Sequence, residues 1–501
     1  MKQSTSKPGS FPYHVFGISL FFLAHGYSEN VGLIPFSEML VFFLGASVVS
    51  ILLLLFLTKK MRSVIKAGLV TTIILSFYLF FGAIQDRLKH SNTLFSLSKY
   101  SILIPVFLVL TIIVYFLIKK SSKDFSKINN YANALLLALL LFDFTSITKQ
   151  FFGNKTLDDK NAEAISNSLS KCDTCSKPDI YLIVLDEYWG NRSLKNYFHY
   201  DNNRFTTFLK QKGFFVATDP SSNYACTPVS MASMMSMKYM DWLNGHKDPD
   251  VVDYALGAKI IRNNNVVRFL KSEGYEIKNY SIFDMDGKNA VFDVSDLPIK
   301  LRLITAKTLW SRVVKDLSWN LIVKAPEKST WFAQMFNKEY KDGNTKVIDL
   351  MDKEIAIDKI EKPRFIYGHL LMPHYPYIYD STGKEQFEYS YFNPNLPRKK
   401  DDSCYLQYLV YTNNKIKDLV NLIFEKGKKN SAVIIMSDHG NRHFESTDKS
   451  VSANNNFNAV FLPQKNYSLF YDSVSNVNQF RIIFNSLFDQ HLPVLKDSVV
   501  F

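Results

Sequence analysis

The residues best suited to metal chemistry stand directly after a short apolar run. Residues 431–440 read Ser-Ala-Val-Ile-Ile-Met-Ser-Asp-His-Gly, which places an oxygen donor, Asp438, beside a nitrogen donor, His439. The run is too short and too continuously apolar for an amphipathic helix, so it is typical of a strand buried on both faces of a parallel sheet. Open α/β sheets bind ligands at the carboxyl ends of their strands, and Gly440 permits the turn that brings both side chains to one divalent cation. Such a pair is also common in plain turns, so a metal site needs partners elsewhere.

A second apolar strand also ends in acids. Ile180–Leu185 is followed by Asp186 and Glu187. Carboxylate oxygens at the carboxyl end of a strand stand where an α/β sheet presents its ligand-binding residues. The sequence therefore predicts that this strand contributes to the same metal site.

A hydroxyl group at a predicted helix start is the candidate nucleophile. Residues 223–234 read Asn-Tyr-Ala-Cys-Thr-Pro-Val-Ser-Met-Ala-Ser-Met, which is typical of a helix with Thr227 at the N-cap and Pro228 in the first helical position. The same geometry directs backbone N–H groups and the positive end of the helix dipole at a phosphate or sulfate, with the Thr227 oxygen as nucleophile. An alcohol attacks poorly unless its pKa is lowered, and a neighbouring divalent cation lowers it.

Two histidines follow a further predicted strand. Residues 365–377 read Phe-Ile-Tyr-Gly-His-Leu-Leu-Met-Pro-His-Tyr-Pro-Tyr, and the prolines fix the shape of the loop that carries His369 and His374. One of the two is expected to orient or protonate an anionic substrate oxygen. The alternative is that each is an ordinary hydrogen-bonded surface residue.

The elements that position these residues lie in the second of two halves that differ in composition. The chain of 501 residues is 47% hydrophobic overall, but long apolar stretches are concentrated in the first 150 residues. Five membrane crossings are expected, at Met39–Leu57, Ala67–Ile84, Ile102–Ile118 and, with weaker support, Phe11–Ala24 and Tyr131–Ile147. The formal charge of +13 comes from scattered Lys and Arg, many beside these spans, so a membrane explains it better than nucleic acid.

Basic residues set the expected orientation. They fill the links between the second and third spans and between the fourth and fifth: Lys59, Lys60, Arg62, Lys66, Lys119, Lys120, Lys123 and Lys127. Both links should be cytoplasmic, so everything beyond Lys149 lies outside. We predict a multi-pass protein of the bacterial cytoplasmic (inner) membrane, with a transmembrane helical domain at 1–150, a linker at 151–177 and a catalytic domain at 178–501 on the periplasmic or extracellular side.

Four cysteines fit that side of the membrane. Cys172 and Cys175 lie in the polar linker, where an oxidising compartment favours a local disulfide over a zinc site with a single ligand pair. The sequence leaves open whether Cys226 and Cys404 are paired. Beyond the linker, predicted strands alternate with predicted helices at 193–213 and 404–426, which indicates an α/β fold.

Taken in chain order, four loops supply an acid, a hydroxyl, a histidine and an Asp-His pair, and this set resembles the sulfatase and alkaline phosphatase superfamily. The motifs are Leu185-Asp186-Glu187, Thr227-x-x-Ser230-x-Ala232, Pro373-His374-x-Pro376 and Ser437-Asp438-His439-Gly440. After several membrane spans, the set is most similar to that of lipoteichoic acid synthases and lipid A phosphoethanolamine transferases. The resemblance implies a doubly wound sheet of the alkaline phosphatase/sulfatase type with helices on both faces, preceded by a bundle of about five transmembrane helices.

The resemblance also implies roles for individual residues. The family's metal ligands fall on Asp186, Thr227, Asp438 and His439, and its substrate-contacting histidine falls on His374. One divalent ion is expected, Zn²⁺ or Mn²⁺, with Ca²⁺ or Mg²⁺ as alternatives. Additional candidates for the site are Glu187, His369, Arg442, His443, Ser230 and Cys226. Two features depart from the transferases, which usually have Glu at the position of Asp186 and a further histidine for which His443 is the candidate here.

The resemblance leaves three functions open. Soluble sulfatases oxidise a cysteine to formylglycine in a Cys-x-Pro-x-Arg setting, and Cys226-Thr-Pro-Val-Ser230 begins in the same way but lacks the arginine. We therefore expect an unmodified Thr227 that transfers or hydrolyses a phosphate ester, with a membrane lipid or lipid-linked donor and an envelope glycan or lipid acceptor. A sulfate-ester hydrolase and a non-catalytic membrane-anchored binding protein are the alternatives. Donor, acceptor and oligomeric state are not readable from the sequence.

Overall fold

The chain folds into two compact units that do not follow the chain order. The computed structural model describes residues 11–91, 93–153, 165, 168–243, 249–294, 297, 299–315, 330–357, 361–386, 398–442 and 451–500. The first unit combines Met1–Thr156 with Pro298–Ser318, and the second combines Leu157–Leu297 with Trp319–Phe501. A short segment from the second half of the sequence therefore packs with the N-terminal unit.

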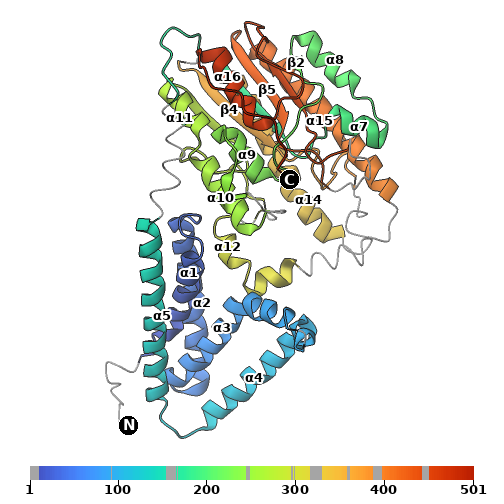
Figure 1. Ribbon diagram of the computed structural model, residues 1–501. Helices are drawn as coiled ribbons and strands as arrows, with labels where there is room; N and C mark the ends of the chain where they lie inside the picture. The colour runs from blue at the N-terminus through green and yellow to red at the C-terminus, as the bar shows by residue number, and fades with distance from the viewer. Residues whose placement is uncertain are drawn as a thin grey trace. The chain divides into compact units, whose positions relative to one another are not determined.

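The N-terminal unit is a bundle of apolar helices (Figure 1). Its described elements are α1 (His14–Ser28), α2 (Phe36–Met61), α3 (Val64–Lys89), the 3₁₀ turn η1 (Phe95–Ser98), α4 (Tyr100–Lys120), α5 (Ser126–Gly153) and the short α12 (Arg302–Thr305). Four of these helices, α2 to α5, are long and apolar enough to cross a membrane. The first predicted crossing corresponds to α1, whose 15 residues are fewer than the roughly 20 that span a hydrocarbon core.

Exposed apolar side chains distinguish this bundle from a soluble one. Val41, Leu52, Phe116 and Phe142 each expose about half or more of their surface. Surface of this kind is expected to contact lipid, since a soluble protein rarely leaves such broad apolar area in water. The predicted N-terminal region of membrane helices is thus confirmed as a set of apolar helices.

The second unit is built on a six-stranded mixed sheet. Its strands are β1 (Asp179–Leu185), β2 (Phe215–Val216), β3 (Glu276–Tyr280), β4 (Arg364–Leu370), β5 (Ser431–Ser437) and β6 (Asn458–Phe461), in the order β2-β6-β5-β1-β4-β3. The neighbours β5, β1, β4 and β3 are parallel, whereas β6 is antiparallel to β5 and β2 is antiparallel to β6. Every residue of β1, β4 and β5 is buried, as the continuous apolar runs predict.

Helices cover both faces of this sheet (Figure 1). They are α7 (Asn191–Phe198), α8 (Asn203–Lys212), α9 (Thr227–Ser236), α10 (Val251–Arg262), α11 (Asn265–Ser272), α14 (Thr330–Ile355), α15 (Arg398–Lys426) and α16 (Gln479–Phe488). On one face, Phe365 of β4 contacts Phe480 of α16. On the other, Phe461 of β6 contacts Phe424 of α15. The predicted α/β class with helices on both faces is confirmed, with an antiparallel β6 added to the parallel core.

Candidate metal centre

Strand register brings two carboxylates together. β1 and β5 are adjacent and parallel, and Leu185 pairs with Ser437 at their carboxyl ends. The next residues along the two strands are Asp186 and Asp438, so both acids leave the sheet at one edge. One oxygen of Asp438 accepts the backbone N–H of His439 at 2.8 Å and that of Glu187 at 3.2 Å. The other oxygen, Oδ2, is thereby directed away from the backbone.

His439 has its ring orientation fixed by the main chain. Its Nδ1 lies 2.7 Å from the Gly440 carbonyl oxygen, which can only accept, so Nδ1 carries the proton and Nε2 presents a lone pair. Nε2 lies 3.4 Å from Asp438 Oδ2. What Gly440 provides here is space, because a Cβ at that position would lie 2.4 Å from Trp189 Cδ1 and 2.5 Å from the Asn455 carbonyl oxygen.

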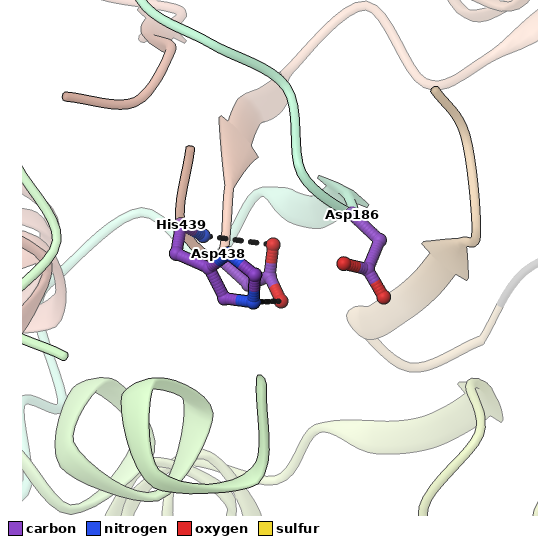
Figure 2. Close-up of side chains that lie close together, drawn as sticks. All are labelled: Asp186, Asp438 and His439. Carbon is purple, nitrogen blue, oxygen red and sulfur yellow. Dashed lines mark hydrogen bonds and ion pairs between the residues drawn. The ribbon is translucent and has the colours of Figure 1, made fainter. Parts of the chain in front are cut away.

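Asp186, Asp438 and His439 form a donor set that fits a divalent cation. One ligand atom from each lies within 4.8 Å of the other two, and Figure 2 shows Asp186 turned toward the other two side chains. All three residues are buried, and Asp186 Oδ1 and Asp438 Oδ2 accept no hydrogen bond from any residue that the structure describes. Buried carboxylate oxygens in that state are normally paired with a cation or a donor. Two carboxylates and one imidazole are ligands of Zn²⁺ and Mn²⁺.

The electrostatics of this cluster also favour a cation. Burial, with the charges of Asp438 and Glu187, raises the pKa of Asp186 well above its usual range. Burial lowers the pKa of His439, so its ring stays neutral and available as a ligand. A divalent cation among these groups would relieve the repulsion between the carboxylates.

Thr227 joins the cluster at the start of α9. Its Oγ1 lies 3.1 Å from His439 Nε2 and, in the tautomer described above, the hydroxyl donates to that nitrogen. The expected N-cap position is displaced by one residue, since Cys226 is the cap and Thr227 is the first residue of the helix. Within the described residues, no side chain caps the start of α9. The Thr227 hydroxyl bonds His439 and does not cap its own helix.

Glu187 turns to a different set of partners. Its backbone is in the left-handed conformation, with φ 57°, so its side chain points in a different direction from that of Asp186. One carboxylate oxygen lies 3.3 Å from Arg442 Nε and 3.9 Å from His374 Nε2. Glu187 therefore holds two cationic or protonatable side chains beside the cluster and lies outside the three-residue donor set.

The two predicted histidines occupy different places. His374 is partly exposed, its Nδ1 bonds the Tyr375 carbonyl oxygen, and its ring stacks on Tyr340. His369 is buried, with Nδ1 2.8 Å from the Tyr367 hydroxyl and Nε2 3.9 Å from Asp186 Oδ2. Burial lowers the pKa of His369 to about 4, so it is neutral at physiological pH. Of the two histidines, only His374 is therefore partly exposed to solvent.

Two further residues support the loop that carries Asp438 and His439, and a third, Tyr254, lies beside Arg442. Ser230 Oγ donates to the Asp438 carbonyl oxygen at 2.6 Å, and Asn476 Nδ2 donates to the same oxygen at 2.8 Å. Burial raises the pKa of the Tyr254 phenol, whose neighbours are Cys226 and Arg442. Sequence reasoning missed Asn476 and Tyr254, because an isolated Asn or Tyr carries no spacing signal. His443 lies outside the described residues.

The cysteines resolve into two kinds. Cys172 and Cys175 form the local disulfide that the sequence predicts. Cys226 and Cys404 are buried and belong to no disulfide. Burial raises the pKa of the Cys226 thiol to about 11, so the thiol is protonated at neutral pH.

Comparison with known proteins then identifies the family. The sulfatase family model matches residues 178–478, which is more than half of the chain. The chain belongs to the sulfatase family. It is thereby a member of the alkaline phosphatase superfamily, as its motifs predicted, and the matched region holds the whole cluster of Asp186, Thr227, Asp438 and His439.

Solved structures similar to this sulfatase-family chain include transferases and sulfatases. The C-terminal periplasmic domain of EcEptC from Escherichia coli is 13% identical, with a TM-score of 0.38, over 64% of this chain and 84% of that one. The integral membrane lipooligosaccharide phosphoethanolamine transferase EptA from Neisseria meningitidis is 11% identical, with a TM-score of 0.37, over 95% and 96%. BT1596, a 2-O GAG sulfatase, is 10% identical, with a TM-score of 0.36, over 65% and 73%. No curated protein is significantly similar in sequence.

Proposed function

We propose that this sulfatase-family protein transfers or hydrolyses a phosphate ester through Thr227. The observation that carries the proposal is the position of the Thr227 hydroxyl, 3.1 Å from His439 Nε2 and beside the buried carboxylates of Asp186 and Asp438. A nucleophile, a neutral nitrogen donor and two oxygen donors are the parts that metal-assisted transfer from an ester requires. Asp186, Asp438, His439 and Thr227 would hold the ion.

The first half of the reaction would load Thr227. A divalent cation bound here supplies charge that lowers the pKa of an adjacent alcohol and neutralises an anionic ester. The Thr227 proton passes to solvent, Thr227 Oγ1 attacks the phosphorus, and the bond from phosphorus to the leaving alcohol breaks. His374 Nε2 gives a proton to that leaving oxygen. The product is a phosphodiester on Thr227.

The second half would unload Thr227. The acceptor hydroxyl attacks the phosphorus, the bond from phosphorus to Thr227 Oγ1 breaks, the acceptor proton returns to His374, and Thr227 Oγ1 takes a proton back from solvent. Water as acceptor gives hydrolysis, and a sugar hydroxyl gives transfer. Arg442, positioned by Glu187 at 3.3 Å, is placed to stabilise the anionic oxygens throughout.

The setting of the site supports a lipid donor. Four helices of the chain are long and apolar enough to span a bilayer, so the same polypeptide that carries the cluster is a membrane protein. We propose that a membrane lipid or lipid-linked molecule supplies the phosphate ester, that an envelope glycan or lipid receives it, and that the catalytic domain lies on the outer side of the cytoplasmic membrane. The basic residues that flank α2, α3, α4 and α5 at one end support that orientation.

Sulfate-ester hydrolysis is the second candidate, favoured by the family match and by the position of Cys226 next to Thr227. That chemistry would need Cys226 as an aldehyde. Mass spectrometry of the peptide containing Cys226 separates the two candidates, because a formylglycine there would contradict the threonine mechanism.

Replacement of Thr227 tests the first candidate directly. We expect Thr227→Ala to lower turnover of bis-p-nitrophenyl phosphate and of headgroup-labelled phospholipid by roughly 10³-fold or more, as the loss of a nucleophile does. Thr227→Ser, which keeps an attacking oxygen, should retain substantial activity. Metal content measured by elemental analysis should show the ion still bound in Thr227→Ala, since three ligands remain. Unchanged turnover in Thr227→Ala, or turnover of p-nitrophenyl sulfate alone, would overturn the proposal.

A further inference from the structure

A basic segment from the middle of the catalytic half packs with the membrane helices. Residues 299–315 lie between β3 and β4 in sequence, yet they belong to the N-terminal unit. The segment contains five Lys or Arg residues and no Asp or Glu: Lys300, Arg302, Lys307, Arg312 and Lys315. Nothing in the proposed reaction uses it, so its purpose has to be sought in its own contacts.

The first half of the segment is fixed to α1 and α2. Ile304 of α12 packs so closely on α1 that a Cβ at Gly26 would lie 2.7 Å from its side chain. The Leu301 backbone N–H donates to Glu38 Oε2 at 3.1 Å, and Glu38 stands in the first turn of α2. The segment thus packs closely on α1, because Gly26 has no side chain, and it is bonded to α2 through the Glu38 carboxylate.

The second half is fixed to α3. The Gly82 N–H donates to the Lys307 carbonyl oxygen at 2.7 Å, and a Cβ at Gly82 would lie 2.8 Å from the Lys307 backbone. Arg312 makes two hydrogen bonds to Asp86, at 2.6 and 3.0 Å. Leu309 packs on the buried cluster that contains Phe81 of α3. A bidentate ion pair and an apolar anchor therefore hold the segment in one register.

All of these contacts involve the same end of the bundle. Gly26 is near the end of α1, Gly82 and Asp86 are near the end of α3, and Glu38 is near the start of α2. The opposite ends of α2 and α3 carry the lysine-rich link. In a bilayer spanned by α2 and α3, the segment would therefore lie where these helices leave the hydrocarbon core, on the side away from those lysines.

Large apolar side chains are exposed at this level. Trp310 is 67% exposed, Phe36 at the start of α2 is 73% exposed, and Phe95 of η1 is 53% exposed. Tryptophan and other aromatic side chains gather at membrane–water interfaces, where an apolar ring and a polar edge are both satisfied. Arg312 is paired with Asp86 and Lys307 with Glu29, at 3.6 Å, whereas Lys315 is exposed near Trp310 in sequence and can attract anionic head groups.

We propose that residues 299–315 are a second membrane contact of this protein, in which Trp310 inserts among the phospholipid head groups of the outer leaflet. The contacts with α1, α2 and α3 fix the depth of the segment, and the bilayer is the occupant because Trp310, Phe36 and Phe95 are all exposed at one end of helices whose own apolar side chains are exposed. The proposal is independent of the reaction at Thr227.

Fluorescence quenching in proteoliposomes tests the contact. The full-length protein, which has five tryptophans, is reconstituted in phosphatidylcholine brominated on its acyl chains and compared with the Trp310→Phe variant. We expect bromolipid to quench the Trp310 component, which is the signal lost in the variant, and aqueous iodide to leave most of it intact. Trp242→Phe, in the second unit, is the control whose lost component bromolipid should leave unquenched. A Trp310 component quenched by iodide and untouched by bromolipid, or by neither, would refute the proposal.

A wedge at Gly82 tests whether docking sets the depth. Gly82→Leu places a side chain against the Lys307 backbone, whereas Gly45→Leu on α2 is a matched control because nothing lies within 4 Å of a Cβ there. We expect Gly82→Leu to lower the bromolipid quenching of Trp310 at least twofold and Gly45→Leu to leave it unchanged. Equal quenching in both variants would contradict the docking step.

Discussion

Asp186 and Glu187 are neighbours in sequence, yet the backbone sends them to different partners. The left-handed conformation of Glu187 turns its carboxylate to Arg442, while Asp186 joins Asp438 and His439. Sequence reasoning could place both acids at the end of a strand, but it could not tell a ligand from a partner of an arginine, because φ at a single residue leaves no pattern in the sequence. The metal assignment of Glu187 stays a prediction that experiment can decide.

Removal of one ligand should separate these roles. We expect Asp438→Asn to lower Zn²⁺ or Mn²⁺ affinity by more than the roughly 10–100-fold that loss of an outer-shell partner causes. Glu187→Gln is the matched control, and it should bind the metal while it weakens activity through Arg442 and His374. Metal titration followed by thermal unfolding measures both, since a ligand at 100 times its Kd stabilises the fold by about 2.7 kcal/mol.

Two outcomes would contradict this reading of the cluster. Full metal-induced stabilisation in Asp438→Asn would show that the ion binds elsewhere. If Glu187→Gln lost as much metal-induced stabilisation as Asp438→Asn, Glu187 would be a metal ligand. Its ion pair with Arg442 would then exist only in the metal-free protein.

At the level of elements, the sequence predicted the central strands but not their order in the sheet. Continuous apolar runs predicted β1, β4 and β5, and the acids at the ends of β1 and β5 predicted where a site would form. The helix expected at 193–213 is instead two helices, α7 and α8, because His199 takes a left-handed conformation that ends α7. The adjacency of β1 and β5 depends on long-range pairing, which local periodicity does not record.

The amino end of the sheet holds a buried ion network that the sequence did not reveal. Arg364 begins β4 and is 2% exposed, and its Nη2 lies 2.7 Å from Asp179 Oδ2 at the start of β1. Its Nη1 lies 3.0 Å from Glu354 Oε1. The network therefore joins β1, β4 and α14 at the end of the sheet opposite the metal centre.

Loss of that arginine should destabilise the fold without reaching the site. We expect Arg364→Met to lower the free energy of unfolding by about 3–5 kcal/mol, because Asp179 is then buried without its main partner. The exposed pair of Arg192 and Asp219, at 2.6 Å, is the control, and Arg192→Met should change stability by about 0–1 kcal/mol. Urea unfolding followed by fluorescence compares the two variants, and equal midpoints would show that the buried network adds nothing.

Across the whole molecule, composition separated the membrane half from the catalytic half but could not place residues 299–315. The apolar stretches of the first 150 residues are visible to a hydropathy count, which needs only neighbours in sequence. The contacts of Arg312 with Asp86 and of Leu301 with Glu38 join residues more than 200 positions apart. Such pairs leave no local trace, so the sequence alone does not reveal that residues 299–315 pack with the bundle.

The packing of residues 299–315 predicts the membrane topology of the chain. These residues lie within the catalytic half of the sequence, and they contact α1 and α3 near the ends of these helices. The loop that contains Thr93 should share the outer side, and the loop that contains Lys123 should be cytoplasmic. In right-side-out vesicles, we expect a membrane-impermeant maleimide to label Thr93→Cys and to label Lys123→Cys only after permeabilisation, both positions being exposed. Background should be low because Cys226 and Cys404 are buried and the other two cysteines form a disulfide. Labelling of Lys123→Cys in intact vesicles would reverse the orientation and remove the outer-leaflet setting proposed for both Thr227 and Trp310.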